Sequence, residues 1–278
     1  PSACNRDASS WDFGTCSALR ILRSRGPLTE LSMSQLVYVD CLEPTQNLSF
    51  YLSMEEFVAR HLPPADYFFM WQVMPSVIFG RNQDPANEVN VEYCRSHGIR
   101  TYRRKSGGGC VYADMSNVML SYITPEDNVS ETFARYLQMV SETLGALGID
   151  AHPSGHNDIM LGDRKVSGNA IYHIPGRVIA HGTLLYDTDM ENMLHAITPS
   201  HTKLSKHGVE SVRQRICLLK DYTNLPLEEI KQRIRQHLCG SQTITLTADD
   251  LRVVRDIEKE YLNPAFIGLP PSDPSPLA

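Results

Sequence analysis

The stretch RRKSGGGCVYAD, residues 103–114, places two arginines and a lysine directly before three consecutive glycines and then continues into apolar residues. Three glycines cost conformational entropy and pack nothing, so they indicate backbone that adopts positive φ or comes close to another group. The neighbouring cations suggest that this group is an anion. Successive amides of such a turn can converge on an oxyanion or a phosphate, although a tight hairpin without a ligand has the same composition.

Short runs rich in aromatic and β-branched residues lie on both sides of this turn. YFFMWQV, SVIFG and IRTYR precede it, and CVYA and NVMLSYI follow it. Such runs, separated by turn residues, predict strands, so the glycine turn joins strand to strand. A Walker-type phosphate loop would instead open a helix and end in GK[ST], and the sequence has neither feature here.

Helical patterns alternate with these strands along the chain. The clearest is ETFARYLQMVSETLGALG, whose apolar residues recur at helical spacing before Gly148. Further helices are predicted at NLSFYLSMEEFVARHL, NVEYCRSHG, LEEIKQRIRQHL and ADDLRVVRDIEKEYL, and further strands at LVYVD, NDIML, RKVSGNAIY, RVIAHGTLLY and TITL. Since strands dominate the first two thirds, we expect a mixed sheet with helices packed on it.

Composition excludes several classes of protein. The 278 residues suffice for one large domain, and no apolar run is long enough to cross a bilayer. A net charge of −6 argues against general nucleic-acid binding. The seven cysteines have no CxxC pair, which favours free thiols in a reducing cytosol. We interpret residues 1–34 as a poorly ordered extension and residues 263–278 as a proline-rich tail.

Two further segments contain residues that could perform chemistry. In HNDIMLGDRKVSGNA, Lys165 lies in a predicted strand beside small residues, so it either points into a cleft or is a solvated strand lysine. Asp158 could bind a hard cation such as Mg²⁺ or could cap a turn. In AHGTLL, His181 precedes a glycine in a strand, where a buried, hydrogen-bonded histidine is the ordinary interpretation.

The combination is more specific than any one segment. FFMWQVMPSVIFGRNQ, RRKSGGGCVYAD, HNDIMLGDRKVSGNA, AHGTLL and KLSKHGVESVRQR occur in the order and approximate spacing of the lipoate-protein ligase family, which residues 36–219 resemble. The resemblance implies an α+β fold with a mixed, largely antiparallel sheet flanked by helices, like the catalytic core of biotin ligases and class II aminoacyl-tRNA synthetases. It implies a catalytic domain at residues 35–262 and a cytoplasmic enzyme.

The resemblance also implies a reaction. Family members activate lipoic acid with ATP and Mg²⁺ to lipoyl-AMP and transfer the lipoyl group to a lysine of an acceptor. The acceptors are apo lipoyl domains of 2-oxoacid dehydrogenase E2 subunits or the glycine-cleavage H protein. No nucleic acid or membrane is expected as a partner. Apolar side chains such as Trp71, Val77 and Val111 are candidates for the slot that holds the acid.

By the same resemblance, Lys165 is the expected catalytic residue, which contacts the lipoate carboxylate and the α-phosphate. Asp158 is the expected ligand of Mg²⁺. The residues expected to bind substrate or adenylate are Arg103, Arg104, Ser106, Gly107, Gly108, Gly109, Val111, Asn157, Ser167, Gly168, His181, Gly182 and Thr183.

The sequence departs from the family pattern in places. Ala113 and Ala180 stand where the family often has histidine, and Tyr172 stands where it often has a basic residue, which leaves the choice between lipoate and octanoate open. Only about sixty residues follow Leu219, so the small accessory domain of two-domain members is expected to be absent. A separate accessory protein could then be needed for activation, with this chain transferring lipoyl from preformed lipoyl-AMP.

Three other functions stay open. An ATP-independent octanoyl or lipoyl transferase of the same fold needs a thiolate, but the segment before NDIML reads AHPSGH, without a cysteine. A biotin ligase would have a GRGR-type loop in place of RRKSGGG. A non-catalytic lipoyl-binding module would not need Lys165. Lys203, Lys206, Arg213 and Arg215 could dock an acidic lipoyl domain or could be a solvated surface.

Overall fold

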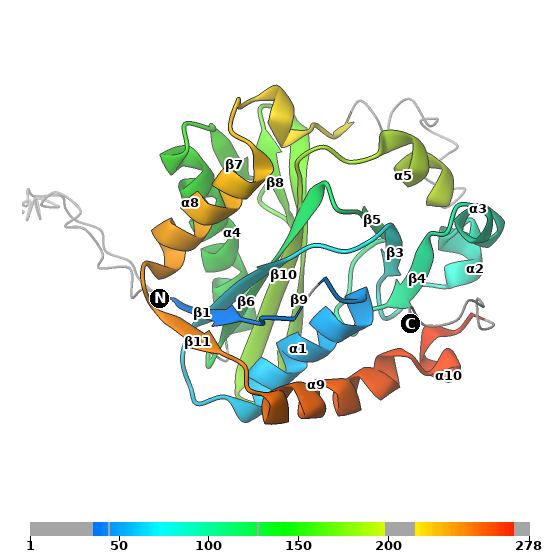
Figure 1. Ribbon diagram of the computed structural model, residues 1–278. Helices are drawn as coiled ribbons and strands as arrows, with labels where there is room; N and C mark the ends of the chain where they lie inside the picture. Colours follow the sequence, from blue (N-terminus) through cyan, green and yellow to red (C-terminus); the bar gives the residue numbers. More distant parts are fainter. Residues whose placement is uncertain (1–35, 44, 127, 198–214, 270–278) are drawn as a thin grey trace, which may run out of the picture. The chain divides into compact units, whose positions relative to one another are not determined.

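The computed structural model of the protein describes residues 36–43, 45–126, 128–197 and 215–269. The expected extension at residues 1–34, the end of the proline-rich tail and the lysines and arginine of segment 203–213 lie outside these residues. Within them the chain is α+β, with a largely antiparallel sheet flanked by helices (Figure 1), which confirms the predicted fold class.

Two sheets form the framework of the described part. The larger has eight strands in the order β11-β1-β2-β6-β10-β9-β8-β7, and the smaller has the order β4-β3-β5. In the larger sheet β1 pairs in parallel with β2 and β11, and the other neighbours are antiparallel. The strands are β1 (Val37–Asp40), β2 (Tyr67–Trp71), β3 (Ser76–Phe79), β4 (Arg100–Arg103), β5 (Val111–Ala113), β6 (Asn117–Thr124), β7 (Ala151–Pro153), β8 (Asp158–Leu161), β9 (Arg164–Ile174), β10 (Arg177–Leu185) and β11 (Thr243–Thr245).

Helices cover both faces of the larger sheet. In Figure 1, α1 and α9 lie side by side below the sheet, and α4 and α8 lie together at its upper left. The helices are α1 (Leu48–His61), α2 (Pro85–Glu88), α3 (Val91–Ser96), α4 (Val129–Ala146), α5 (Met190–Ala196), α8 (Leu227–Cys239), α9 (Ala248–Tyr261) and α10 (Pro264–Ile267), with a 3-10 turn η1 (Leu219–Asp221).

The sequence of strand β2 explains why helices pack on both faces of the sheet. Its side chains point alternately to opposite faces. Tyr67, Phe69 and Trp71 join the hydrophobic core that contains α1 residues, whereas Phe68 joins the core formed with α4 and α8. Burying one such side chain is worth about 1.5–3 kcal/mol, so the continuous apolar run YFFMW stabilises a strand between two helical layers.

Helix boundaries follow local sequence signals. Asn128 caps α4 by accepting a hydrogen bond from the Glu131 amide, and Gly148 adopts φ +81° just after the helix, where the sequence predicts a stop. The predicted irregular tail differs at its start, because α10 is helical. Asn263 caps α10 with its side chain and Pro264 occupies the first turn, two features that favour a helix start.

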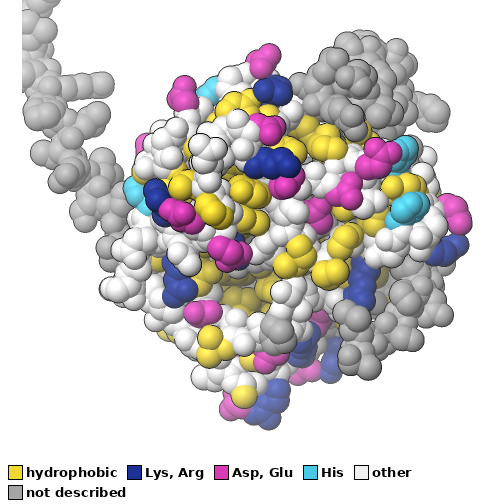
Figure 2. Space-filling view, turned by 45° about the horizontal axis from the view of Figure 1, so that its top comes forward, with side chains coloured by type: hydrophobic (Ala, Val, Ile, Leu, Met, Phe, Trp, Pro, Cys, Tyr) yellow, Lys and Arg dark blue, Asp and Glu magenta, His cyan; other side chains and the backbone are white. Residues whose placement is uncertain are grey.

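No helix of the described residues is long and apolar enough to cross a membrane. On the face in Figure 2, hydrophobic side chains gather near the middle, and acidic and basic groups are interspersed around them.

Candidate active site

The glycine turn between β4 and β5 is held by the arginine that precedes it. The Arg104 guanidinium donates to the carbonyls of Gly107 and Gly109 at 2.7 Å each and to the Ile78 carbonyl at 3.1 Å. Gly108 has φ +90°, and a Cβ there would lie 2.9 Å from Arg104 Nη2. Only glycine meets both conditions without strain.

Arg104 is almost fully buried, with 5% of its surface exposed. Burial lowers its pKa to about 10, while the nearby Cys110 and Glu55 act in the opposite direction. The guanidinium therefore remains charged at neutral pH and brings a fixed positive charge under the turn.

The backbone amides of the turn have a different environment from its carbonyls. The Ser106 carbonyl accepts from the Arg81 amide at 3.0 Å, and the carbonyls of Gly107 and Gly109 accept from Arg104. Within the described ranges, no group accepts a hydrogen bond from the amides of Gly107, Gly108 or Gly109. Amides left free beside a buried cation suit an anionic ligand.

Lys165 approaches the turn from β9. Its Nζ lies 2.8 Å from Asp158 Oδ1 on the neighbouring strand β8, and the two side chains are 33% and 28% exposed. A Cβ on Gly168 would lie 2.6 Å from Lys165 Nζ. The glycine thus provides the space in which the ammonium group lies, which explains the small residues beside this lysine in the sequence.

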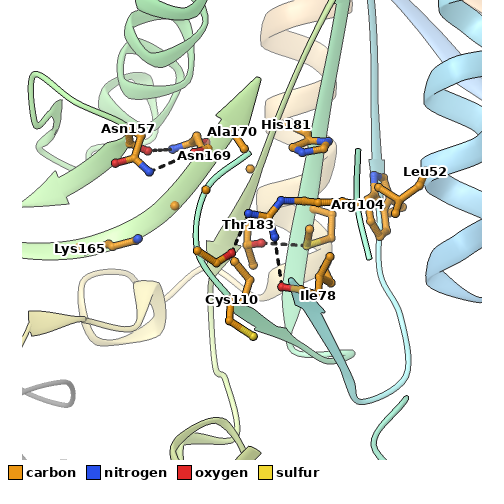
Figure 3. A pocket seen from close by; sticks show the side chains of 17 residues that line it. Leu52, Ile78, Arg104, Cys110, Asn157, Lys165, Asn169, Ala170, His181 and Thr183 are labelled. Atoms are coloured by element: carbon orange, nitrogen blue, oxygen red, sulfur yellow. Dashed lines mark hydrogen bonds between the residues drawn. The ribbon is translucent and has the colours of Figure 1, made fainter. Parts of the chain in front are cut away.

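Two adjoining cavities meet at Lys165. The first, of about 90 Å³, lies between the two sheets and has Leu52, Trp71, Ile78 and Met119 among its lining. The second, of about 390 Å³, reaches toward α5. In Figure 3, Lys165 and Arg104 extend toward one another from opposite sides of the first cavity. The residues common to both linings are Gly109, Cys110, Val111, Asn157, Lys165, Gly168 and Thr183.

Most of the predicted site residues lie around these cavities. Those that line the first are Arg104, Gly108, Gly109, Val111, Asn157, Lys165, Gly168, His181, Gly182 and Thr183, and Asp158 lines the second. Ser106, Gly107, Ser167 and Arg103 line neither. Val77 is fully buried in a separate hydrophobic core, whereas Trp71 lines the first cavity.

The other two cations before the turn point elsewhere. Arg103 donates to the carbonyls of Arg81, Gln83 and Ile267 at 2.8–3.1 Å. Lys105 Nζ lies 2.7 Å from carboxylate oxygens of both Glu56 and Glu260. Burial alone would lower the pKa of Lys105, but its hydrogen bonds to these carboxylates raise it. Of the three cations, only Arg104 faces the first cavity.

Sequence reasoning missed several residues of the site. Asn169 and Asn157 bond reciprocally, side chain to backbone carbonyl, at 3.1 and 3.3 Å, and so join β9 to the loop before β8 (Figure 3). The asparagine in SGNA follows Lys165 by four residues and could have been proposed on that ground. The side chain of Glu55 lies 2.8 Å from His181 Nδ1, but in SMEEFVARH it is indistinguishable from a solvated helix charge.

The arrangement suits a reaction that brings two anions together. One narrow, mostly apolar cavity adjoins a wider one, and a lysine stands where they meet. Fixed cations and free amides at such a junction would stabilise charge that crowds together in a transition state.

The chain is similar in sequence to known proteins. Residues 47–239 match the model of the lipoyl protein ligase A/B catalytic domain. The chain is 34% identical over 225 residues to lipoate-protein ligase 1 of Staphylococcus aureus, which covers 78% of this chain and 67% of that protein. It is 33% identical over 219 residues to lipoate-protein ligase LplJ of Bacillus subtilis, and the match covers 75% of this chain and 66% of that protein. The chain thus spans about two thirds of the length of these relatives.

Solved structures share the fold. The putative lipoate protein ligase Ta0514 of T. acidophilum with bound lipoic acid superposes with a TM-score of 0.72 at 22% identity, over 83% of this chain and 98% of that one. A lipoate-protein ligase A bound with ATP superposes with a TM-score of 0.72 at 23% identity, over 84% of this chain and 99% of that one. A bi-partite lipoate protein ligase from T. acidophilum, studied with its E2 lipoyl domain, superposes with a TM-score of 0.73 at 23% identity. The superposition covers 85% of this chain and 98% of that one.

Proposed function

The chain belongs to the lipoyl protein ligase A/B catalytic domain family, and from that premise we propose that it joins lipoate to an acceptor lysine through a lipoyl-adenylate. One observation supports this most strongly: Lys165 stands at the junction of a narrow, largely apolar cavity and a wider one. An acyl-adenylate has the matching parts, which are an apolar chain, a central phosphate and a nucleoside.

The first cavity would hold lipoate. Its apolar residues Leu52, Trp71, Ile78 and Met119 suit the hydrocarbon chain and the dithiolane ring. The carboxylate would lie toward Lys165 and the free amides of the glycine turn. Ta0514, which has the same fold, is described with bound lipoic acid, which supports lipoate as a ligand of this chain.

The second cavity would hold the nucleotide. Its lining beyond the shared residues is mainly apolar, with Leu185, Met193, Leu194, Ile197 and Ile216, and such surfaces suit a purine ring. The α-phosphate would then lie beside Lys165. A relative of the same fold binds ATP, as the description of its structure states.

The residues present fit a magnesium ion only as a partner of bound phosphates. The described residues contain no group of three or more His, Cys, Asp or Glu side chains that could hold a metal ion. Mg²⁺ in nucleotide sites usually takes one or two carboxylates together with phosphate oxygens and water, so Asp158 would be its ligand here. When bound, the ion would neutralise phosphate charge during adenylation.

The proposed reaction has two steps. A lipoate carboxylate oxygen attacks the α-phosphorus of ATP, and the bond from that phosphorus to the oxygen bridging to the β-phosphate breaks, which releases pyrophosphate. The deprotonated amine of the acceptor lysine then attacks the acyl carbon, AMP leaves with the bonding electron pair, and the amide nitrogen loses its extra proton to solvent. Lys165 and Arg104 would stabilise the negative charge that accumulates in the first step.

The acceptor protein is a further part of the proposed function. We propose apo lipoyl domains of 2-oxoacid dehydrogenase E2 subunits, or the glycine-cleavage H protein, as acceptors. A relative of the same fold, described as bi-partite, was studied with its E2 lipoyl domain. That description favours a second candidate function, in which this chain transfers lipoyl from preformed lipoyl-AMP and a separate protein supports activation.

A thiol-dependent transfer is disfavoured. Cys110 is the one described cysteine that lines the cavities. Burial raises the pKa of its thiol to about 12, with Arg104 acting in the opposite direction, so the thiolate is scarce at neutral pH. The five described cysteines are free thiols.

The test is transfer to a purified apo lipoyl domain, followed by intact mass spectrometry. Two reactions run in parallel, one with lipoate and MgATP and one with preformed lipoyl-adenylate. Modification in both, abolished by Lys165→Ala, is expected of a self-sufficient ligase. Modification from the adenylate alone would indicate a missing accessory protein. Absence of modification in both would contradict the proposal and favour a binding module.

A further inference from the structure

A buried carboxylate outside the cavities contacts one of their walls. Glu55 of α1 is 3% exposed and lines neither cavity. Its two carboxylate oxygens lie 2.8 and 3.0 Å from Nδ1 of His181, which lines the first cavity from β10. On the other side of the imidazole, Nε2 lies 2.7 Å from the Ser106 hydroxyl. Three residues from three separate elements thus form one hydrogen-bonded row.

The carboxylate is itself fixed in place. The Ser121 hydroxyl donates to Glu55 Oε1 at 2.6 Å, and the Trp71 indole donates to Ser121 at 2.9 Å. Both donors come from neighbouring strands of the large sheet, β2 and β6. The carboxylate therefore has a donor on Oε1 that is independent of His181, and its orientation does not depend on the imidazole.

This geometry selects one tautomer of the neutral imidazole. An ionised carboxylate only accepts hydrogen bonds, so Nδ1 of His181 must carry a proton to bond Glu55. In the neutral ring Nε2 is then the acceptor, and the Ser106 hydroxyl donates to it. The carboxylate thereby determines the direction of every hydrogen bond in the row.

The row ends at the glycine turn. Ser106 is the first residue of that turn, and its side chain is 1% exposed. His181 holds the Ser106 side chain, while Arg104 holds the carbonyls of Gly107 and Gly109. The turn is thus fixed from two sides by side chains, which leaves its amides as the groups free to meet a ligand.

We propose that Glu55 is a positioning residue, which holds His181 in the Nδ1-protonated tautomer and thereby fixes Ser106 and the glycine turn for the acyl-adenylate. The order serine, histidine, carboxylate matches that of a nucleophilic triad. Ser106 nevertheless lines neither cavity, so its hydroxyl orders the turn and does not attack a substrate.

The effect on catalysis rests on the proposed ligase function, but the tautomer does not, so the test measures both. Long-range ¹H–¹⁵N NMR of the imidazole nitrogens reports the tautomer of His181, with its signals assigned by their loss in His181→Gln. The variants are Glu55→Gln, Ser106→Ala and, as the matched control, Glu258→Gln. Glu258 is a carboxylate that is buried to a similar depth, at 4% exposed, but bonds Ser49 and Arg255.

The expected results differ between the variants. Glu55→Gln should shift His181 away from the Nδ1–H tautomer and lower kcat for transfer from lipoyl-adenylate by about 10- to 100-fold, by analogy with the loss of a partner that orients a metal-bound histidine. Ser106→Ala should keep the tautomer and lower kcat to a similar degree. Because Glu55, His181 and Ser106 act in one row, the double variant Glu55→Gln/Ser106→Ala should have a kcat only slightly below that of either single variant. Glu258→Gln should change neither readout.

Two results would overturn the proposal. One is a Glu55→Gln protein, folded by circular dichroism, that keeps the Nδ1–H tautomer. The other is a Glu55→Gln variant that loses the tautomer and retains full transfer activity. If the wild-type chain transfers no lipoyl group, the proposed function fails, whereas the tautomer measurement still decides whether Glu55 positions His181.

Discussion

Lys165 has its place because Gly168 lacks a side chain. The Cβ of an alanine there would lie 2.6 Å from Nζ and 2.7 Å from Cε of the lysine. We predict that Gly168→Ala displaces the flexible end of Lys165 and lowers kcat/KM for lipoyl transfer at least about tenfold, since small displacements of a positioned group are costly. The fold should persist, because the clashing atoms lie at the end of a side chain.

Transfer kinetics and thermal unfolding of Gly168→Ala check this prediction. Gly145→Ala in α4 is the control, because a Cβ there meets nothing within 4 Å. It should keep full activity and gain a little stability, since alanine favours a helix more than glycine does. Full activity of Gly168→Ala would show that the space beside Lys165 is not needed.

Substitution of Cys110 tests the alternative in which a cysteine thiolate transfers the acyl group. Its pKa is raised to about 12, so the reactive thiolate is nearly absent at neutral pH and increases as the pH rises toward that value. We predict that Cys110→Ala retains transfer activity within about twofold, because a nucleophilic cysteine would need a lowered pKa. Alkylation of Cys110 by iodoacetamide, followed by peptide mass spectrometry, should be negligible at pH 7. Loss of transfer in the alanine variant would revive the thiol mechanism.

Predictability from sequence differs among single residues. Lys165 and the glycine turn could be identified, because small residues beside a lysine and three glycines in a row are unusual. The two adjacent arginines could not be distinguished, since both precede the turn with the same charge. The structure distinguishes them, because Arg104 donates to the carbonyl of Gly107 in the turn, whereas Arg103 donates to the carbonyl of Ile267 in α10. Glu55 gave no signal, because its helix pattern is also that of a solvated face.

At the scale of elements, Arg103 connects β4 to the loop after β3 and to α10. Its guanidinium donates to the carbonyls of Gly80, Arg81, Gln83 and Ile267. We predict that Arg103→Gln costs about 1 to 3 kcal/mol of stability, through the loss of several half-buried hydrogen bonds made by one side chain. The KM for lipoate should be unchanged, because Arg103 lines neither cavity.

Thermal unfolding and steady-state kinetics of Arg103→Gln separate the two roles. Arg95→Gln provides the control, because Arg95 forms an exposed ion pair with Glu92 that should contribute little. A raised KM with unchanged stability would instead support the role in substrate binding that the sequence predicts for Arg103.

The elements were predictable to the extent that their patterns were long. The helix predicted at residues 47–62 is α1, and the strand predicted at YFFMWQV contains β2. Pairing was harder to predict. β11 has three residues and lies far from β1 in the sequence, yet the two pair in parallel. Such a contact depends on how α8 and α9 pack, which no local pattern in TITL encodes.

At the scale of the molecule, the site follows from how the two sheets meet. Ile78 of β3 and Val111 of β5 come from the small sheet, whereas Met119, Lys165 and Thr183 come from the large one, and all five line the first cavity. Neither sheet makes the site alone. The sequence motifs predicted most of the residues that line the cavities, but the two adjoining cavities around Lys165 could be recognised only in the folded structure.

The central claim is that the cavities around Lys165 bind an acyl-adenylate. Titration calorimetry with a non-hydrolysable lipoyl-adenylate analogue tests it most directly and needs neither an acceptor nor an accessory protein. We predict binding at one site per chain, at least about tenfold weaker in Lys165→Ala, since the loss of a charge-assisted hydrogen bond costs this much or more. Arg164→Ala, which removes the adjacent cation that contacts Tyr222, should bind as the wild type does. Absence of binding by the wild type, or equal affinity in Lys165→Ala, would contradict the account.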